Sequence, residues 1–218
     1  MKFIQIEENV WGCIVSNGAF YLLKDNDGKI VFVDTGLRQF SKYRINKCLN
    51  TIGKEYKDIK SILLTHADGD HVGGLVHILR RCNPVIFASE ETCSYLLHRE
   101  MPEHYGRLNG LLRVIYFYSV PSIKIENIVT DNDYIDYCGG IHVYSTPGHC
   151  DGHLSFYLQK KSILFSGDLI VEKDGRVAPS PSIIAADSKK LQQSYEKMVS
   201  LNPKVICTGH SGKIVFGC

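Results

Sequence analysis

The ten residues THADGDHVGG, from 65 to 74, contain two histidines and two aspartates within six positions. Imidazole nitrogens and carboxylate oxygens are donors that zinc and iron take from proteins. The run before them, IKSILLT, is apolar and predicts a buried strand. Two interpretations follow from this pattern: the residues form a metal site at the end of a strand, or they form a polar turn.

Three further polar residues follow apolar runs in the second half of the chain, in STPGHCDGH, LFSGD and VICTGH. Strand ends that lead into turns are where a rigid sheet aims side chains into a shared site. Two ions held about 3.5 to 4 Å apart need about six or seven ligands. The candidate metal ligands are therefore His66, Asp68, Asp70, His71, His149, Asp168 and His210.

Five short motifs resemble the signature of the metallo-β-lactamase fold superfamily of metal-dependent hydrolases. In chain order they are DTG at 34–36, HADGDH at 66–71, TPGH at 146–149, SGD at 166–168 and TGH at 208–210. The resemblance covers nearly the whole chain. It implies an α/β fold built as a four-layer αββα sandwich, with two mixed β-sheets face to face, helices outside and the metals at one edge.

The resemblance also implies how two divalent metal ions would be shared among the candidate ligands. His66, Asp68 and His149 would hold the first ion, Asp70, His71 and His210 the second, and Asp168 would bridge them. Most members of the family have a histidine where this chain has Asp68. Because a carboxylate is a harder donor, it favours Mn or Fe alongside Zn, with Zn as the default expectation.

By the same resemblance, the nucleophile is a hydroxide that bridges the two ions. Divalent cations lower the pKa of bound water from about 15.7 towards about 7. Asp70 and Asp168 are the expected catalytic residues, since Asp70 accepts a hydrogen bond from the hydroxide and Asp168 fixes both ions. Asp34 either orients a ligand from behind or caps a turn.

The residue expected to bridge the two ions, Asp168, indicates which class of substrate to expect. Asp168 resembles the glyoxalase-II-like and lactonase-like branches, whereas true β-lactamases of this fold have Cys, Ser or His there. Only eight residues follow His210, which argues against the added helical region of glyoxalase II. We expect hydrolysis of a small ester, thioester or lactone. The alternatives are a small phosphodiester or phosphate-ester hydrolase, an iron-dependent oxidoreductase of the same fold, and a metal-poor binding module.

Composition predicts one cytoplasmic domain, residues 1–218, that acts on a small molecule. The chain is 44% hydrophobic and 22% charged, and its net charge of +2 comes from interspersed charges, which favours neither a nucleic-acid nor a membrane partner. The start, MKFIQIEENVWG, is too charged for a signal peptide. Without such a signal, the eight cysteines are expected to be reduced thiols. The oligomeric state is left open.

Hydrophobic patterns predict where the elements lie. Strands separated by turn residues predict an antiparallel run over 12–34, and a helical pattern follows over 37–52. The other predicted elements are a strand at 59–65, helices at 75–82, 89–98 and 187–200, and strands at 84–88, 141–146, 153–158, 162–168 and 204–210. Ser89 is the predicted N-cap of the helix over 89–98.

Other chemistry-bearing residues are assigned ordinary roles. Cys150 adjoins a candidate ligand and is interpreted as a small buried residue, although a nearby metal would lower the pKa of a thiol. His153 is placed to hydrogen bond behind the ligands. Surface or packing roles are expected for His77, His98, His104 and His142, and core packing or a pocket wall for Tyr105, Tyr116, Phe117 and Tyr118.

Overall fold

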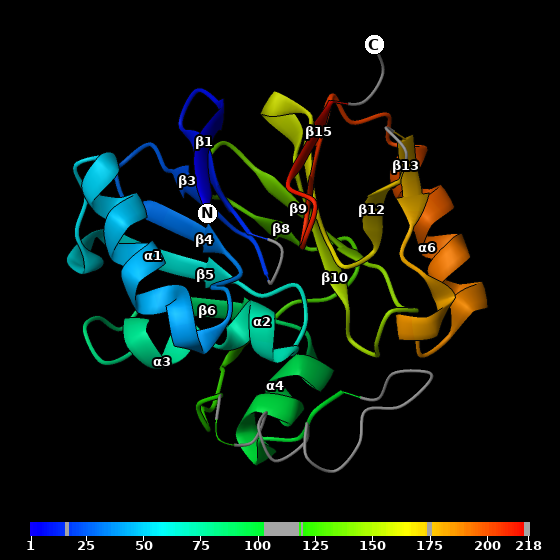
Figure 1. Ribbon diagram of the computed structural model, residues 1–218, viewed down its shortest axis with the longest axis horizontal. Helices are drawn as coiled ribbons and strands as arrows, with labels where there is room; N and C mark the ends of the chain where they lie inside the picture. The colour runs from blue at the N-terminus through cyan, green and yellow to red at the C-terminus, as the bar shows by residue number, and fades with distance from the viewer. Residues whose placement is uncertain (16–17, 103–117, 119, 174–175, 216–218) are drawn as a thin grey trace.

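Short runs rich in Val, Ile and Phe form the strands of two mixed β-sheets that pack face to face (Figure 1). The computed structural model describes residues 1–15, 18–102, 118, 120–173 and 176–215. The first sheet runs, in spatial order, β1 (Lys2–Glu7), β2 (Val10–Ile14), β3 (Phe20–Lys24), β4 (Ile30–Val33), β5 (Ile59–Leu63), β6 (Val85–Ala88) and β7 (Asn127–Ile128).

The second sheet is built from the second half of the chain. Its spatial order is β15 (Lys213–Val215), β14 (Val205–Thr208), β11 (Ile163–Gly167), β10 (Leu154–Leu158), β9 (Ile141–Ser145) and β8 (Tyr134–Ile135). A separate hairpin joins β12 (Ile170–Lys173) to β13 (Arg176–Pro179). The predicted antiparallel run at the start is confirmed by the pairing of β2, β3 and β4, after which the first sheet continues with parallel strands.

Helices cover the outer face of each sheet and complete the predicted αββα order of layers (Figure 1). Apolar side chains of α1 (Arg38–Thr51), α3 (Leu75–Ile78) and α4 (Glu90–His98) pack with the first sheet. Leu191 and Met198 of α6 (Ser188–Val199) pack against the second. The remaining short elements are α2 (Gly69–Val72) and single 3₁₀ turns at Tyr56–Asp58, Gln159–Lys161 and Ser182–Ile184.

Alternation along the strands decides which side chains enter which layer. In β4, Ile30 and Phe32 point towards the helices, while Val31 and Val33 enter the core between the sheets. Phe165 of β11 lies in that same central core, together with its neighbours from both sheets. Because both faces of these strands are buried, they appear in the sequence as continuous apolar runs.

One predicted helix is shorter in the structure, and β1, β7, β8, β15 and the hairpin of β12 and β13 were not predicted. The helix expected over 75–82 ends at Ile78 as α3, and turns carry the chain on. The chain departs from the regular helical pattern at Arg81, whose N donates to Ile78 O, three residues before it, at 2.8 Å. The hairpin of β12 and β13 was not predicted, although the Asp-Gly pair at 174–175 in the sequence is a typical hairpin signal.

The carboxyl ends of five strands lie at one edge of the sandwich. β4 and β5 are parallel, as are β11 and β14, and β9 shares their direction because both β9 and β11 run antiparallel to β10. Backbone bonds join the two halves there: Leu154 N donates to Thr65 O at 2.8 Å, and Ala19 N donates to Gly209 O at 2.6 Å. The residues that follow these strands therefore meet.

Among the described residues, no helix combines the length and the apolar character that crossing a membrane requires.

The N-cap of α4 provides a test of this architecture. Ser89 Oγ accepts a hydrogen bond from Thr92 N at 3.2 Å and donates one to Thr92 Oγ1 at 3.0 Å, both buried. Ser89→Ala should lower the free energy of unfolding by about 1 kcal/mol, measured by urea denaturation. Ser94→Ala, at an exposed position of the same helix, should change it by less than about 0.5 kcal/mol. Equal losses in the two variants would contradict the cap.

Candidate metal centre

All seven candidate ligands meet at the shared edge of the two sheets. His66, Asp68, Asp70 and His71 follow β5, and His149, Asp168 and His210 follow β9, β11 and β14. Donor atoms within 4.8 Å of one another define two groups: His66, Asp68, His149 and Asp168 form one, and Asp70, His71 and His210 form the other. The resemblance divided six of these residues in the same way and assigned Asp168, which falls in the first group here, to both ions.

In the first group, three imidazole or carboxylate donors converge from two different sheets. Asp68 Oδ2 lies 3.4 Å from His66 Nε2 and 3.2 Å from His149 Nε2. His66 is completely buried, and its Nε2 has no hydrogen-bond partner among the described residues. A buried imidazole nitrogen that faces carboxylate oxygens in this way fits a metal ligand, because a cation would satisfy both.

The second group has the same character. Asp70 Oδ2 lies 3.4 Å from His210 Nε2 and 3.9 Å from His71 Nε2. His71 Nε2 is also buried and lacks a hydrogen bond within the described part of the chain. The donor set is again one of imidazole and carboxylate, which Zn, Mn and Fe accept.

Asp168 lies between the two groups and faces both. Its Oδ1 is 3.2 Å from His71 Nε2, and its Oδ2 is 3.1 Å from His210 Nε2 and 3.8 Å from His149 Nε2. Oδ1 therefore faces the second group, and Oδ2 lies between His210 of the second group and His149 of the first, so this carboxylate is placed to contact ions in both groups.

Asp34 holds two of the histidines from behind. Its Oδ1 accepts a hydrogen bond from Thr65 N at 2.9 Å, and its Oδ2 lies 2.8 Å from both Thr65 Oγ1 and His71 Nδ1. Thr65 Oγ1 in turn lies 2.9 Å from His66 Nδ1. With the Nδ1 atoms engaged, the Nε2 atoms of both rings are directed to the site. Of the two roles left open for Asp34, the structure shows the orienting one.

His153 supports Asp168 by a hydrogen bond to its backbone. The amide of Asp168 donates to His153 Nε2 at 3.2 Å, and His153 Nδ1 lies 2.9 Å from Thr146 Oγ1. Both ring nitrogens are therefore occupied by hydrogen bonds within the protein. Burial, and after it the charges of His66 and His149, hold the pKa of His153 well below its usual value, so the ring stays neutral.

Glycines allow the loops to approach the ligands closely. A Cβ on Gly209 would lie 2.0 Å from Asp168 Oδ1, and one on Gly18 would lie 2.1 Å from the carbonyl oxygen of Asp70. Neither position has room for a side chain. The sequence signal for Gly209 was its place in TGH, whereas nothing in the sequence marked Gly18 or Thr65.

The carboxylates of the site hold protons on nearby imidazoles. Burial opposes protonation of His71, but Asp168, Asp34 and Asp70 raise its pKa well above the usual value. A hydrogen bond to Asp168 raises the pKa of His210 to about 9. Since metal binding requires neutral imidazole, cations would replace these protons as the balance for the carboxylate charge.

Cys150 is confirmed as a small buried residue. Its side chain is 1% exposed, and burial together with the charges of Asp68 and Asp168 raises the pKa of its thiol well above the usual value. A thiol held protonated is a poor nucleophile. The seven cysteines that the structure describes are free thiols.

The other histidines and aromatic residues named from the sequence either form hydrogen bonds away from the candidate ligands or lie outside the described residues. His77 Nε2 lies 3.0 Å from Arg38 O, His98 Nδ1 lies 3.0 Å from Ser94 O, and His142 Nε2 lies 2.8 Å from Gln159 Oε1. The carbonyl of Tyr118 accepts a hydrogen bond from Arg38. His104, Tyr105, Tyr116 and Phe117 are outside the described residues.

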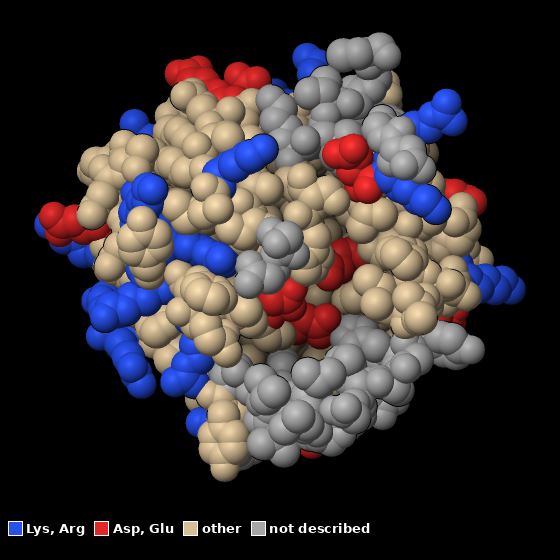
Figure 2. All heavy atoms as spheres, in the orientation of Figure 1, with Lys and Arg blue, Asp and Glu red and all other residues tan. Residues whose placement is uncertain are grey.

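The candidate centre reaches the surface on the face shown in Figure 2, where acidic side chains lie in a depression near the middle. Asp70 is the most accessible of the carboxylates, with 28% of its side chain exposed against 17% for Asp68 and 7% for Asp168. Lys and Arg gather on the side of this face that is formed by α1. The charges that are interspersed along the sequence are thus locally separated in the fold.

An αββα sandwich with histidines and aspartates at one edge of its sheets defines a class of metal-binding proteins. The sequence profile of the metallo-beta-lactamase superfamily matches residues 14–210, and the chain belongs to this superfamily. The fold is also that of a metallo-beta-lactamase family protein from Thermus thermophilus, with a TM-score of 0.75 and 22% identity over 97% of this chain and 76% of that one.

Two relatives bear hydrolase names. A probable metallo-hydrolase of Bacillus subtilis, YybB, is 26% identical over 196 residues, which cover 90% of this chain and 81% of that protein. The hydroxyacylglutathione hydrolase of Buchnera aphidicola is 29% identical over 201 residues, 90% of this chain and 63% of the enzyme.

The contacts of Asp34 generate a prediction about metal affinity. Asp34→Ala removes the acceptor that fixes Thr65 and His71, so the affinity for Zn²⁺ should fall about 10- to 100-fold, measured by competition with a chromogenic chelator. Asp136→Ala, which removes an exposed carboxylate between β8 and β9, is the matched control and should leave the affinity unchanged. An Asp34→Ala protein that is folded and binds Zn²⁺ normally would show that the contact does not order the site.

Proposed function

We propose that the protein is a dinuclear metal-dependent hydrolase that cleaves a small ester, thioester or lactone. The observation that carries the proposal is the position of Asp168 between two separate His/Asp groups. His66, Asp68 and His149 would hold one ion and Asp70, His71 and His210 the other, with Asp168 shared. Zn is the default metal, and Asp68 makes Mn or Fe acceptable.

Divalent ions bound at such a site lower the pKa of water and polarise a carbonyl oxygen. The chain's own residues would hold the ligands in position and accept the proton of the attacking water. Asp70 is the carboxylate most open to the surface, so it is best placed to accept a proton from an incoming water. Asp34 and His153 act behind the ligands, where their hydrogen bonds keep Thr65, His71 and Asp168 in place.

The same geometry disfavours a covalent mechanism. Cys150 is the thiol next to the site, and its burial keeps it protonated and out of reach of a substrate at the surface. Hydrolysis by water fits both the donor set and the hydrolase names of the relatives. A small phosphate-ester hydrolase is the second candidate, because the same pair of ions suits phosphoryl transfer.

A substrate panel tests the reaction. Protein loaded with Zn²⁺ or Mn²⁺ should hydrolyse thioesters, lactones or carboxylic esters in preference to nitrophenyl phosphates and β-lactams, measured as kcat/KM for each class. Chelation should abolish turnover and added metal should restore it, while Cys150→Ser should retain most of the activity. Turnover that survives chelation, or an acyl adduct on Cys150 detected by mass spectrometry, would refute hydrolysis by metal-activated water; exclusive cleavage of phosphates would favour the second candidate.

The shared carboxylate makes a second prediction. Asp168→Ala should lower kcat/KM at least about tenfold more than Asp68→Ala does at saturating metal, since Asp168 would serve both ions and Asp68 only one. Plasma mass spectrometry should find about two ions per chain in the unmodified protein and a larger loss of metal in Asp168→Ala. A greater defect in Asp68→Ala, or one ion per chain that excess Zn²⁺ or Mn²⁺ does not change, would count against the bridge.

A further inference from the structure

A pocket lies next to the candidate metal centre, against the first turns of α1. It has a volume of about 390 Å³ and is lined by Arg38, Gln39, Lys42, His77 and Tyr118. Its closeness to the centre follows from the backbone. A Cβ on Gly73, two residues after His71, would lie 2.5 Å from Arg38 N. The start of α1 is therefore packed directly on the loop that carries the ligands.

The pocket is positively charged. None of the five residues that line it carries a carboxylate. In the part of the chain that the structure describes, neither Arg38 nor Lys42 has an ion pair with an acidic side chain. The whole of α1, RQFSKYRINKCLNT, holds four basic residues and no acidic one. Among the described residues, no carboxylate therefore pairs with Arg38 or Lys42 in the pocket.

His77 lies in the wall of the pocket, and the neighbouring positive charges affect its pKa. Burial, and then the charges of Arg38, Arg81 and Arg80, lower its pKa. The ring is thus neutral and lies 3.0 Å from the carbonyl oxygen of Arg38, which fixes the start of α1 against α3.

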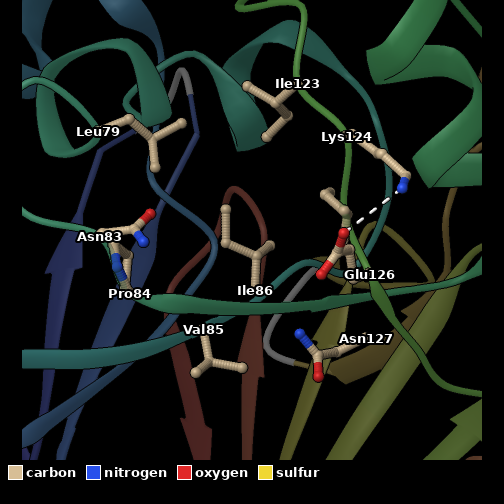
Figure 3. Close-up of a pocket in the computed structure, with 10 residues that line it drawn as sticks. Leu79, Asn83, Pro84, Val85, Ile86, Ile123, Lys124, Glu126 and Asn127 are labelled. Atoms are coloured by element: carbon tan, nitrogen blue, oxygen red, sulfur yellow. Dashed lines mark hydrogen bonds and ion pairs between the residues drawn. The ribbon is translucent and has the colours of Figure 1, made fainter.

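Another pocket of the molecule differs from this one in its charge. It has a volume of about 540 Å³ and lies beside Val85 and Asn127, at the end of β6 away from the metal edge (Figure 3). Its single cation, Lys124, lies 3.4 Å from Glu126, and most of its remaining wall is apolar. That pocket offers no unneutralised charge for an anion.

We propose that the pocket formed by Arg38, Gln39, Lys42 and His77 binds a phosphate group on the leaving group of the substrate. Guanidinium and ammonium groups are the side chains that recognise phosphate, the first through paired hydrogen bonds and the second as a point charge. The pocket shares no residue with the seven candidate ligands, so a phosphate held in the pocket would leave the candidate metal centre open for the scissile bond.

The substrate class that fits both sites is an acyl thioester whose thiol bears phosphate groups on a long arm, of the coenzyme A type. This step rests on the proposed hydrolase function. An arm is required because the residues that line the pocket are different from those that form the candidate metal centre. The phosphate would be held at Arg38 and Lys42 of α1, and the arm would place the acyl carbon beside Asp70 and Asp168.

Two measurements test the proposal separately from the hydrolysis. In the first, calorimetry of the metal-loaded protein with adenosine 3′,5′-bisphosphate, which contains neither a thiol nor an acyl group, should detect binding. Lys42→Ala should weaken it about tenfold, the loss expected for one charge-assisted hydrogen bond. Lys24→Ala, at the end of β3 away from the metal edge, is the matched control and should bind as the unmodified protein does.

In the second measurement, an acyl-coenzyme A is compared with the N-acetylcysteamine thioester of the same acyl group, which lacks phosphate. Lys42→Ala should raise KM for the first about tenfold and leave kcat and the second substrate unchanged. Added salt should narrow the difference between the two substrates, because it screens exposed charges.

The outcomes separate the two proposals. Absence of bisphosphate binding, or binding that Lys42→Ala and Lys24→Ala affect equally, would overturn the phosphate pocket even if both thioesters are hydrolysed. If neither thioester is hydrolysed while the bisphosphate binds through Lys42, the pocket stands and the thioester hydrolase is wrong. Equal KM values for the two thioesters would overturn the assignment of the leaving group.

Discussion

The candidate centre depends on one buried carboxylate, that of Asp34. It stands at the end of β4 with φ of 58°, a backbone conformation that aspartate tolerates better than most residues. From there it binds the backbone and hydroxyl of Thr65, at the end of the neighbouring strand, and the ring of His71. One side chain thereby fixes the start of the motif loop and the direction of two imidazoles. Removing it would take away the carboxylate acceptor of Thr65 N and of His71 Nδ1, both of which are buried.

Asp168 is held in place by a different kind of contact, a hydrogen bond from its backbone to a neutral imidazole. Asp168 follows Gly167, whose φ of 51° turns the chain at the end of β11, and its amide is held by the neutral ring of His153. The loops of the two halves are then joined by backbone hydrogen bonds, such as that from Ala19 N to Gly209 O. The ligands are therefore ordered by two independent frameworks that meet at one edge, and a metal would complete the contact between them.

Acidic and basic side chains occupy different regions of the face that contains the candidate metal centre. Carboxylates dominate the edge where the ions would lie, whereas α1 presents cations immediately beside it (Figure 2). This arrangement suits a substrate with a polarisable carbonyl at one end and an anionic group at the other. It also assigns different tasks to the two sites, since one would provide the reaction and the other would increase affinity for one class of leaving group.

The sequence by itself determined the family, the order of layers and the candidate ligands, because each ligand follows an apolar strand in a short motif that local spacing makes visible. It also predicted the Ser89 cap, which depends on residues only three positions apart. Only the tertiary structure decided that Asp168 faces both groups, that Thr65 lies between Asp34 and His66, and that Arg38 and Lys42 of α1 line a pocket beside the loop of the ligands. These features join residues from different strands and helices. They arise when two sheets pack and bring strand ends together, and such contacts leave no periodic trace in the sequence.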